Sequence, residues 1–218
     1  MATTANLVTQ YLDAQLAGDR NEALRVVIGK GLHAGVAPEA LYLEVVGAAQ
    51  EELGRLWEQG RITVADEHQA SAISQFVLAQ LYPHLARAPG NGKPVLVACV
   101  PGELHEMAAR IASDFLEAAG FEVRYLGANV PTNTLVAHFT RYRPVLVALS
   151  ATMAAHFAAL RRTIRRLRRA GGRDLTIVAG GFLEGAPPEL PPHLDVLTSS
   201  GTARDLVALV QRTPGVGS

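Results

Sequence analysis

The sequence predicts a two-part protein, with a small helical bundle over residues 1–85 and a parallel β-sheet covered by helices over residues 93–218. The first observation is a change of apolar period, from helical spacing in the first part to short β-rich runs in the second. The second is the stretch "PHLARAPGNGKP" between them, whose composition is typical of a linker. The third is that the β-rich runs alternate with helical stretches, which favours a parallel sheet.

Four helices are expected in the first part. Apolar residues recur on one face of the first helix and along a stripe of the third, and short connections between such helices favour an antiparallel bundle. Capping and breaking residues mark the helix boundaries. The first stripe is Leu7, Tyr11, Leu12 and Leu16, the second is Leu43, Val46, Leu53, Leu56 and Trp57, and the boundary signals are Asp19, Gly35, Pro38, Gly60 and the capping pair Thr63 and Asp66.

About five strands are expected in the second part. Their apolar runs are too continuous for half-exposed strands, which indicates a sheet that is covered on both faces. The predicted strands cover 94–100, 121–127, 144–150, 175–181 and a short segment at 195–200, and the predicted helices cover 103–119, 131–142, 153–170 and 202–212.

Composition narrows the class of protein. The chain has 218 residues and no net charge, so its bulk electrostatics do not favour nucleic acid or a membrane surface. Its single cysteine, Cys99, lies in an apolar run and is expected to be buried. The sequence shows neither a signal-peptide pattern nor a membrane-spanning run, so we expect a cytoplasmic protein.

Three candidate positions follow predicted strands. Ligands of such sheets bind at the carboxyl ends of the strands, where His105, Ser150 and the pair Gly180–Gly181 are expected. His105 does not begin a zinc-protease helix, because position 109 is alanine. A lone histidine is more often structural, but Glu103 could accept its second N–H as in metal sites.

These residues resemble a known motif. Glu103-x-His105-x-x-Ala108, Ser150-x-Thr152 and Gly180-Gly181 are similar to the D-x-H-x-x-G … S-x-L … G-G pattern of cobalamin-binding domains, with Glu, Ala and Thr at three of its positions. The resemblance covers residues 93–213 and implies a flavodoxin-like (Rossmann-like) fold with His105 as the lower axial ligand of cobalt. It implies that these residues contact the cofactor: Glu103, Leu104, His105, Glu106, Met107, Ser150, Thr152, Gly180 and Gly181.

The bundle adds a second resemblance. Trp57, followed after nine residues by Glu67 and His68, resembles the W-x9-E-H signature of CarH-type photoreceptors, which use adenosylcobalamin. It implies that Trp57 covers the upper face of the corrin and that Val64, Glu67 and His68 line the adenosyl pocket. Glu58 stands where that family has a cobalt-binding histidine, so after photolysis His68, His33 or water would have to replace it.

The resemblance therefore implies a light sensor rather than an enzyme, in which photolysis of adenosylcobalamin triggers a conformational or oligomeric change passed to a partner. The alternatives are a corrinoid methyl-carrier subunit, which would be a methyltransferase component, and a light-independent cobalamin-binding regulator. A homo-oligomer or a protein output partner is expected. A second, non-covalent chromophore such as a bilin stays open.

One stretch of charge stands apart. The run "RRTIRRLRRAGGR", residues 161–173, places arginines opposite an apolar helical stripe. Its ordinary interpretation is a solvated amphipathic helix, and the alternative is a patch that binds an anion, a nucleic acid or an acidic partner. Since the chain is neutral and the run has no interleaved aromatic residues, direct DNA binding is not expected.

Overall fold

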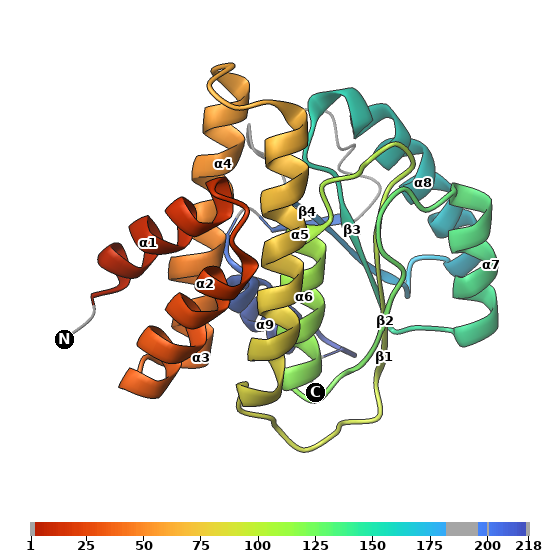
Figure 1. Cartoon of the computed structure of the whole chain (residues 1–218). Coiled ribbons are helices and arrows are strands. Elements are labelled where there is room, and N and C mark those ends of the chain that lie inside the picture. Colours follow the sequence, from red (N-terminus) through yellow and green to blue (C-terminus); the bar gives the residue numbers. More distant parts are fainter. Residues whose placement is uncertain (1–2, 182–195, 200, 217–218) are drawn as a thin grey trace. The chain divides into compact units, whose positions relative to one another are not determined.

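The computed structural model describes residues 3–181, 196–199 and 201–216 (Figure 1). The chain divides into two compact units, Met1–Ala86 and Arg87–Ser218. Each unit has its own buried core and is described by itself. No helix in the described part of the chain is long and apolar enough to cross a membrane.

The first unit is the expected bundle of four consecutive helical stretches. Its core includes the buried Leu7 and Tyr11, and the Tyr11 hydroxyl lies 2.9 Å from the Ser74 hydroxyl within that core. The stretches are α1 (Thr4–Leu16); α2 (Arg20–Leu24) continuing through a π-helical and a 3-10 turn at Arg25–Gly31 and Leu32–Ala34; α3 (Pro38–Ala40), a π-helical segment at Leu41–Gly47 and α4 (Ala48–Glu58); and α5 (Val64–Leu81), followed by a 3-10 turn at Tyr82–His84.

Local chemistry sets the ends of these helices as predicted. The Asp19 carboxylate accepts a hydrogen bond of 2.9 Å from the backbone of Glu22. Gly35 ends the second stretch with a φ of 88°, a conformation that favours glycine. The Thr63 side chain and the Asp66 carboxylate form a reciprocal capping box at the start of α5.

Two details of the bundle differ from the prediction. Leu16 is 41% exposed rather than part of the core face, and the buried positions at that end of α1 are Ala14 and Gln15. The Gln15 amide is buried because it donates to the Ser74 hydroxyl at 2.8 Å, so a polar contact displaces the apolar one. The second and third helices also contain π-helical turns, each of which includes glycine.

The second unit holds a five-stranded parallel sheet in the order β2-β1-β3-β4-β5, which confirms the predicted fold. The register places Cys99 beside Ser150 and Ser150 beside Gly180, so the ends of three neighbouring strands meet at one edge of the sheet. The strands are β1 (Pro94–Cys99), β2 (Glu122–Tyr125), β3 (Leu146–Ser150), β4 (Thr176–Gly180) and β5 (Val196–Ser199).

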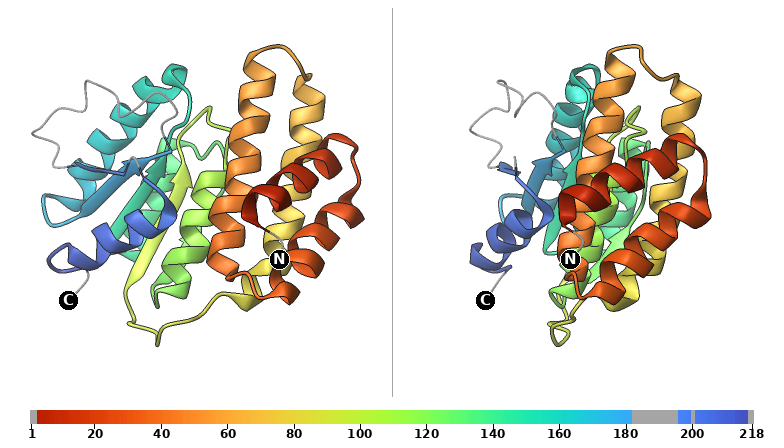
Figure 2. Two further views of the ribbon diagram at one scale, coloured as in Figure 1. Left: turned by 90° about the vertical axis from the view of Figure 1, so that its left-hand side faces the viewer. Right: turned by 60° about the vertical axis from the view of Figure 1, so that its left-hand side comes forward.

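Helices cover both faces of this sheet (Figures 1 and 2). One buried cluster joins the sheet to α6 and α9 on one face, and a second joins it to α7 and α8 on the other. The helices are α6 (Met107–Ala118), α7 (Thr132–Tyr142), α8 (Phe157–Gly171) after a 3-10 turn at Ala154–His156, and α9 (Ala203–Arg212).

Two sequence predictions are wrong in this unit. β2 lies at the edge of the sheet and pairs with β1 alone. Its residues alternate between exposed and half-buried, so this strand is not covered on both faces. The helix expected from residue 103 begins at Met107, since the backbone after β1 turns at Gly102 with a φ of 90°. Residues 103–106 therefore form a loop at the carboxyl end of β1, while Cys99 is buried as predicted.

Candidate functional site

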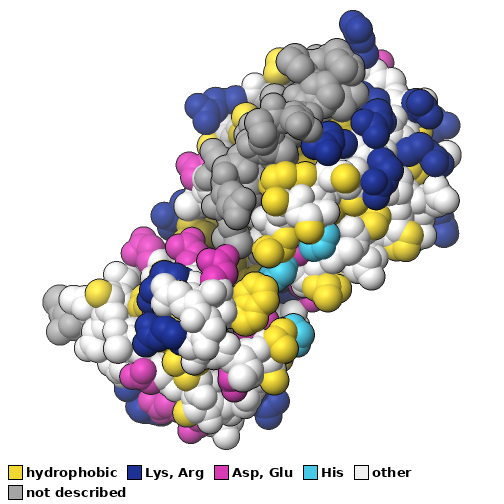
Figure 3. Space-filling model, turned by 90° about the horizontal axis from the view of Figure 1, so that it is seen from above, with side chains coloured by type: hydrophobic (Ala, Val, Ile, Leu, Met, Phe, Trp, Pro, Cys, Tyr) yellow, Lys and Arg dark blue, Asp and Glu magenta, His cyan; other side chains and the backbone are white. Residues whose placement is uncertain are grey.

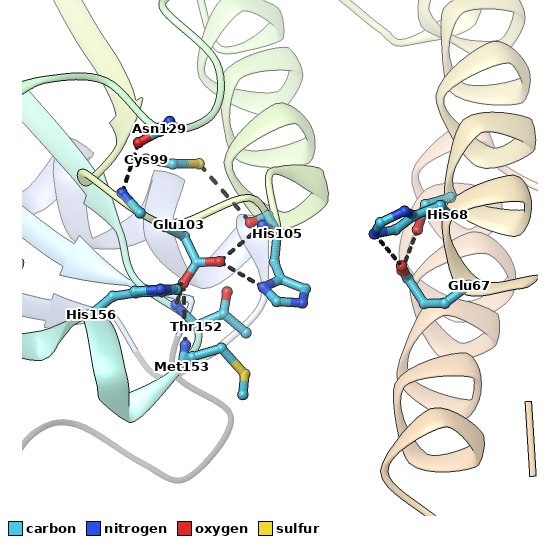
Figure 4. Close-up of polar contacts among 11 residues, drawn as sticks. Glu67, His68, Cys99, Glu103, His105, Asn129, Thr152, Met153 and His156 are labelled. Carbon is cyan, nitrogen blue, oxygen red and sulfur yellow. Dashed lines mark hydrogen bonds and ion pairs between the residues drawn. The ribbon is translucent and has the colours of Figure 1, made fainter. Parts of the chain in front are cut away.

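A buried carboxylate organises the loop after β1 (Figure 4). Glu103 has no exposed surface, and its Oε1 atom accepts hydrogen bonds from the backbone N–H of His105 at 2.9 Å and from its Nδ1 at 2.6 Å. Because an ionised carboxylate only accepts hydrogen bonds, Nδ1 of His105 carries the proton. Nε2 is then the ring nitrogen with a lone pair, on a side chain that is 41% exposed.

The second oxygen of the same carboxylate binds the segment after β3. Glu103 Oε2 accepts from the backbone N–H groups of Thr152 at 2.7 Å and Met153 at 3.2 Å, and from Nδ1 of His156 at 2.8 Å. Glu103 therefore joins two loops that are about fifty residues apart in the sequence. It also sets His156 to the same tautomer as His105, with the proton on Nδ1.

These donors decide the charge of Glu103. Burial by itself disfavours the charged form, but hydrogen bonds from His105 and His156, and from backbone N–H groups, outweigh it and hold the pKa of the Glu103 carboxyl well below its usual range. The site therefore holds a carboxylate at every pH near neutrality. A carboxylate behind an imidazole strengthens the imidazole as a metal ligand.

Asn129 holds the loop from the other side. Its side-chain oxygen accepts a hydrogen bond of 2.8 Å from the Gly102 N–H, and its own N–H donates to the Glu103 carbonyl at 2.9 Å. Gly102 also packs closely on His156, since a Cβ there would lie 3.1 Å from the imidazole ring. The turn that presents Glu103 and His105 is thus fixed by backbone contacts as well as by the carboxylate.

Ser150 and Gly181 lie together at the same edge of the sheet. The Ser150 side chain is buried, and its Oγ atom has no hydrogen-bond partner among the described residues. Gly181 has a φ of 82°, and a Cβ there would lie 2.5 Å from Ser150 Oγ. A buried hydroxyl beside a glycine of this kind fits a polar ligand chain that passes close to the backbone, so these residues suit the nucleotide tail of cobalamin.

The other predicted residues of this unit surround the loop. Leu104 is 64% exposed, which is unusual for a large apolar side chain and leaves it available to an apolar ligand surface. Glu106 precedes α6 and accepts a hydrogen bond of 2.9 Å from the Tyr125 hydroxyl, while Met107 is half-buried at the first position of α6. Gly180 is the last residue of β4, and its carbonyl accepts from the Ala151 N–H.

The structure places the remaining candidates in the bundle. Trp57 is half-buried near the end of α4, Val64 is 52% exposed at the start of α5, and His68 is exposed one turn further on. The Glu67 carboxylate accepts a hydrogen bond of 2.7 Å from the Ser71 hydroxyl, and that hydroxyl accepts one of 3.0 Å from the Gln50 amide. Figure 4 shows Glu67 and His68. Glu67 is therefore held by α4 as well as by its own helix.

The sheet unit thus brings Glu103, His105 and Thr152 into contact, and Ser150 into contact with Gly181. The sequence-based prediction missed His156 and Asn129, which both contact Glu103, and the Gln50–Ser71 pair, in which Ser71 contacts Glu67. No local spacing could reveal them, because 53 residues separate His156 from Glu103 and 27 separate Asn129 from Gly102.

Comparison with known proteins agrees with this geometry. The profile of the B12 binding domain matches residues 93–207, and a second B12 binding domain profile matches residues 7–82. The chain is 35% identical over 149 residues to the HTH-type transcriptional repressor CarH of Myxococcus xanthus, a match that covers 68% of this chain and 49% of that protein. The chain thus spans about half the length of that relative.

Corrinoid proteins are similar over a longer span. The trimethylamine corrinoid protein of Methanosarcina barkeri is 28% identical over 185 residues, covering 83% of this chain and 85% of that protein. The solved structure of the monomethylamine corrinoid protein of the same species shares the fold, with a TM-score of 0.82 over 95% of this chain and 98% of that chain at 16% identity. The chain therefore belongs to the B12-binding domain family, which makes it a cobalamin-binding protein.

Proposed function

We propose that this chain is a light sensor that uses adenosylcobalamin and passes a light-dependent change in conformation or self-association to a partner. The observation that carries the light-sensing part is the presence of Trp57, Glu67 and His68 at the spacing of the CarH-type photoreceptors. The 35% identity to CarH supports it. When bound, adenosylcobalamin would supply a cobalt–carbon bond that visible light breaks.

The residues of the sheet unit would hold the lower side of the cofactor. Nε2 of His105 would ligate cobalt, because Glu103 keeps the proton on Nδ1 and the ring in one orientation. Ser150 would donate to the nucleotide tail through its buried hydroxyl, and Gly181 would let the tail approach the backbone.

The residues of the bundle would hold the upper ligand. Trp57 would offer apolar area to the adenine ring. The Glu67 carboxylate, already oriented by Ser71, would accept hydrogen bonds from the ribose hydroxyls. Val64 and His68 would complete this adenosyl pocket.

The test is an absorption spectrum of the adenosylcobalamin-loaded protein in the dark and after green light, with the elution volume on size-exclusion chromatography recorded for both. We expect a stable dark spectrum, a light-induced spectral change and a shift in elution volume. A spectral change with identical elution and unchanged protease sensitivity would leave the protein without a light-dependent output and would contradict the proposal.

A second candidate is a corrinoid methyl carrier. It is favoured by the similarity to the trimethylamine corrinoid protein, which extends over 85% of that protein. A carrier must present cobalt to separate enzymes and has no use for an adenosyl pocket. Tighter retention of methylcobalamin than of adenosylcobalamin would favour the carrier, and the reverse order would favour the sensor.

A further inference from the structure

The outer face of α8 carries an unusual row of charge. Four arginines within two helical turns lie on an arc of about 100° at the usual rotation of an α-helix. The opposite face packs on the sheet through Leu160, Ile164 and Leu167, which are fully buried. Figure 3 shows Lys and Arg side chains gathered on one part of the surface. The row, called the α8 arginine row below, is Arg162, Arg165, Arg166 and Arg169, all exposed.

These four side chains make no polar contacts that would stabilise the described part of the chain. None of them forms an ion pair or a hydrogen bond with any described residue. Their neighbour Arg168 differs, because its guanidinium donates to the carbonyls of Gly172, at 3.1 Å, and Leu175 and so closes the end of α8. Like charges three and four residues apart destabilise a helix slightly. The row therefore lowers the stability of α8, and no contact within the described fold compensates for this.

The surrounding sequence concentrates the charge further. Residues 123–173 contain ten arginines and not one aspartate or glutamate, although the whole chain has 20 basic and 20 acidic residues. Both helices of this face, α7 and α8, therefore lack any acidic residue. Basic and acidic residues cancel over the whole chain although they are unevenly distributed along it. The neutral net charge therefore does not reveal a basic surface that could bind a polyanion.

The chemistry of the row distinguishes between classes of partner. A stable protein interface buries apolar anchors at its centre, but the exposed large apolar residues among the described ones are Leu16, Val64 and Leu104, none of them on α8. Single-stranded nucleic acid is held by stacking on aromatic rings, and between Arg162 and Arg173 there is none. Guanidinium groups alone suit a regular row of phosphates, since binding to a duplex gains free energy by counterion release.

We infer that the α8 arginine row, four exposed guanidinium groups that are unpaired among the described residues and lie on a helix without acidic residues, binds the phosphate backbone of double-stranded nucleic acid without reading its sequence. Such contacts position a protein on a duplex and carry no sequence information by themselves. This inference departs from the expectation, drawn from the neutral net charge and the lack of interleaved aromatic residues, that the chain does not bind DNA directly. It does not depend on light sensing.

The experiment is fluorescence anisotropy of a labelled 24-base-pair DNA duplex with the cobalamin-loaded protein, repeated at several salt concentrations from about 50 to 200 mM. We expect binding that weakens linearly on a log–log plot, with a slope of about −3.6 or steeper if all four arginines meet phosphates, at about 0.9 per contact. A duplex of unrelated sequence should bind equally well.

Two variants with the same change of charge separate the row from bulk electrostatics. The quadruple substitution Arg162→Gln, Arg165→Gln, Arg166→Gln and Arg169→Gln should weaken binding about tenfold or more at 50 mM salt and make the slope shallower by about 3.6. The matched control, Arg20→Gln, Arg25→Gln, Arg55→Gln and Arg61→Gln, removes four exposed arginines of the bundle and should leave the slope unchanged. Thermal unfolding and the cobalamin spectrum check that both variants are folded.

Several outcomes would overturn the inference. They are no binding to the duplex at 50 mM salt, an unchanged slope in the quadruple α8 variant, or equal losses in the two variants. Tighter binding to poly-glutamate than to the duplex would also overturn it and would assign the row to an acidic protein surface.

Discussion

Nδ1 of His105 lies 2.6 Å from one oxygen of Glu103, and Nδ1 of His156 lies 2.8 Å from the other oxygen of the same carboxylate. One buried acid therefore orients two imidazoles that come from different loops. Of the two, only His105 is the cobalt ligand that we propose. His156 acts through Glu103, as a residue that keeps the carboxylate in place.

Replacing Glu103 with glutamine should weaken cobalamin binding about 10- to 100-fold, the usual effect of removing a group that supports a metal ligand. The amide has one accepting oxygen instead of two. One of the two histidines therefore faces an NH2 group, which cannot accept a hydrogen bond from its Nδ1–H. Titration of apo-protein followed by absorption would measure the loss, with the exposed Glu117→Gln on α6 as control. Equal affinities of Glu103→Gln and wild type would show that the carboxylate does not support the ligand.

His156→Ala should lower cobalamin affinity by about tenfold and reduce the fraction with the spectrum of a histidine-ligated cobalt. His156→Asn should restore much of both, because an asparagine amide can donate from nearly the same place as Nδ1. His105→Ala sets the lower limit of the spectral signal. If the alanine and asparagine variants behave alike, the hydrogen bond to Glu103 has no bearing on the cofactor.

Trp57→Ala should weaken adenosylcobalamin about tenfold more than hydroxocobalamin, since only the former offers an adenine ring to the indole. Parallel titrations of the two cofactors give the ratio directly. Equal losses for both cofactors would mean that Trp57 only packs the bundle.

Gly181→Ala should reduce both cobalamin affinity and the free energy of unfolding, the latter by about 1–2 kcal/mol for an alanine forced to positive φ. Gly172→Ala is a matched control, because Gly172 also has positive φ, at 67°, but among the described residues no atom beyond its chain neighbours lies within 4 Å of the added Cβ. Both variants should lose stability in chemical denaturation, and only Gly181→Ala should lose affinity. A similar loss of affinity in both would remove Gly181 from the ligand site.

Burial, with smaller contributions from Glu103 and Glu106, raises the pKa of the Cys99 thiol to about 12. Alkylation of the native protein by iodoacetamide at pH 8 should therefore be far slower than alkylation of the unfolded chain. In the unfolded chain the thiol has the pKa of a free cysteine, about 8.5. Because folding raises this pKa, the thiol contributes to the stability of the fold at pH values below its pKa in the unfolded chain. That contribution is lost as the pH rises from there toward 12. The stability difference between wild type and Cys99→Ala should shrink over that range, and a constant difference would contradict the assignment.

The succession of helices and strands along the chain could be predicted from the sequence because apolar period and capping chemistry are local. Asp19, Gly35 and the Thr63–Asp66 pair act within four residues of their targets, and the structure has them as predicted. Leu16 was misplaced because its burial depends on a polar contact between α1 and α5, which no period in α1 can report.

The candidate site shows the same division. Its motif residues are visible because they directly follow strands, where a parallel sheet collects them. The groups that hold them come from elsewhere: His156 and Asn129 reach the Glu103 loop only after the sheet has formed. Since these partners are far from the motif in sequence and belong to no recognisable pattern, only the three-dimensional structure identifies them.

The alignment of Cys99, Ser150 and Gly180 across three strands bears on which insertions the chain could tolerate. Extra residues in a surface turn at the opposite edge would leave these neighbours in place. Losing one residue inside β3 would reverse its sides, because Val147 and Leu149 pack toward α7 and α8 while Leu146 and Ala148 pack toward the other face. Such a deletion would exchange the side chains that β3 contributes to the two buried clusters and would also move the Ser150 side chain to the other face. We therefore expect related sequences to differ in the lengths of their turns but to keep the length of β3.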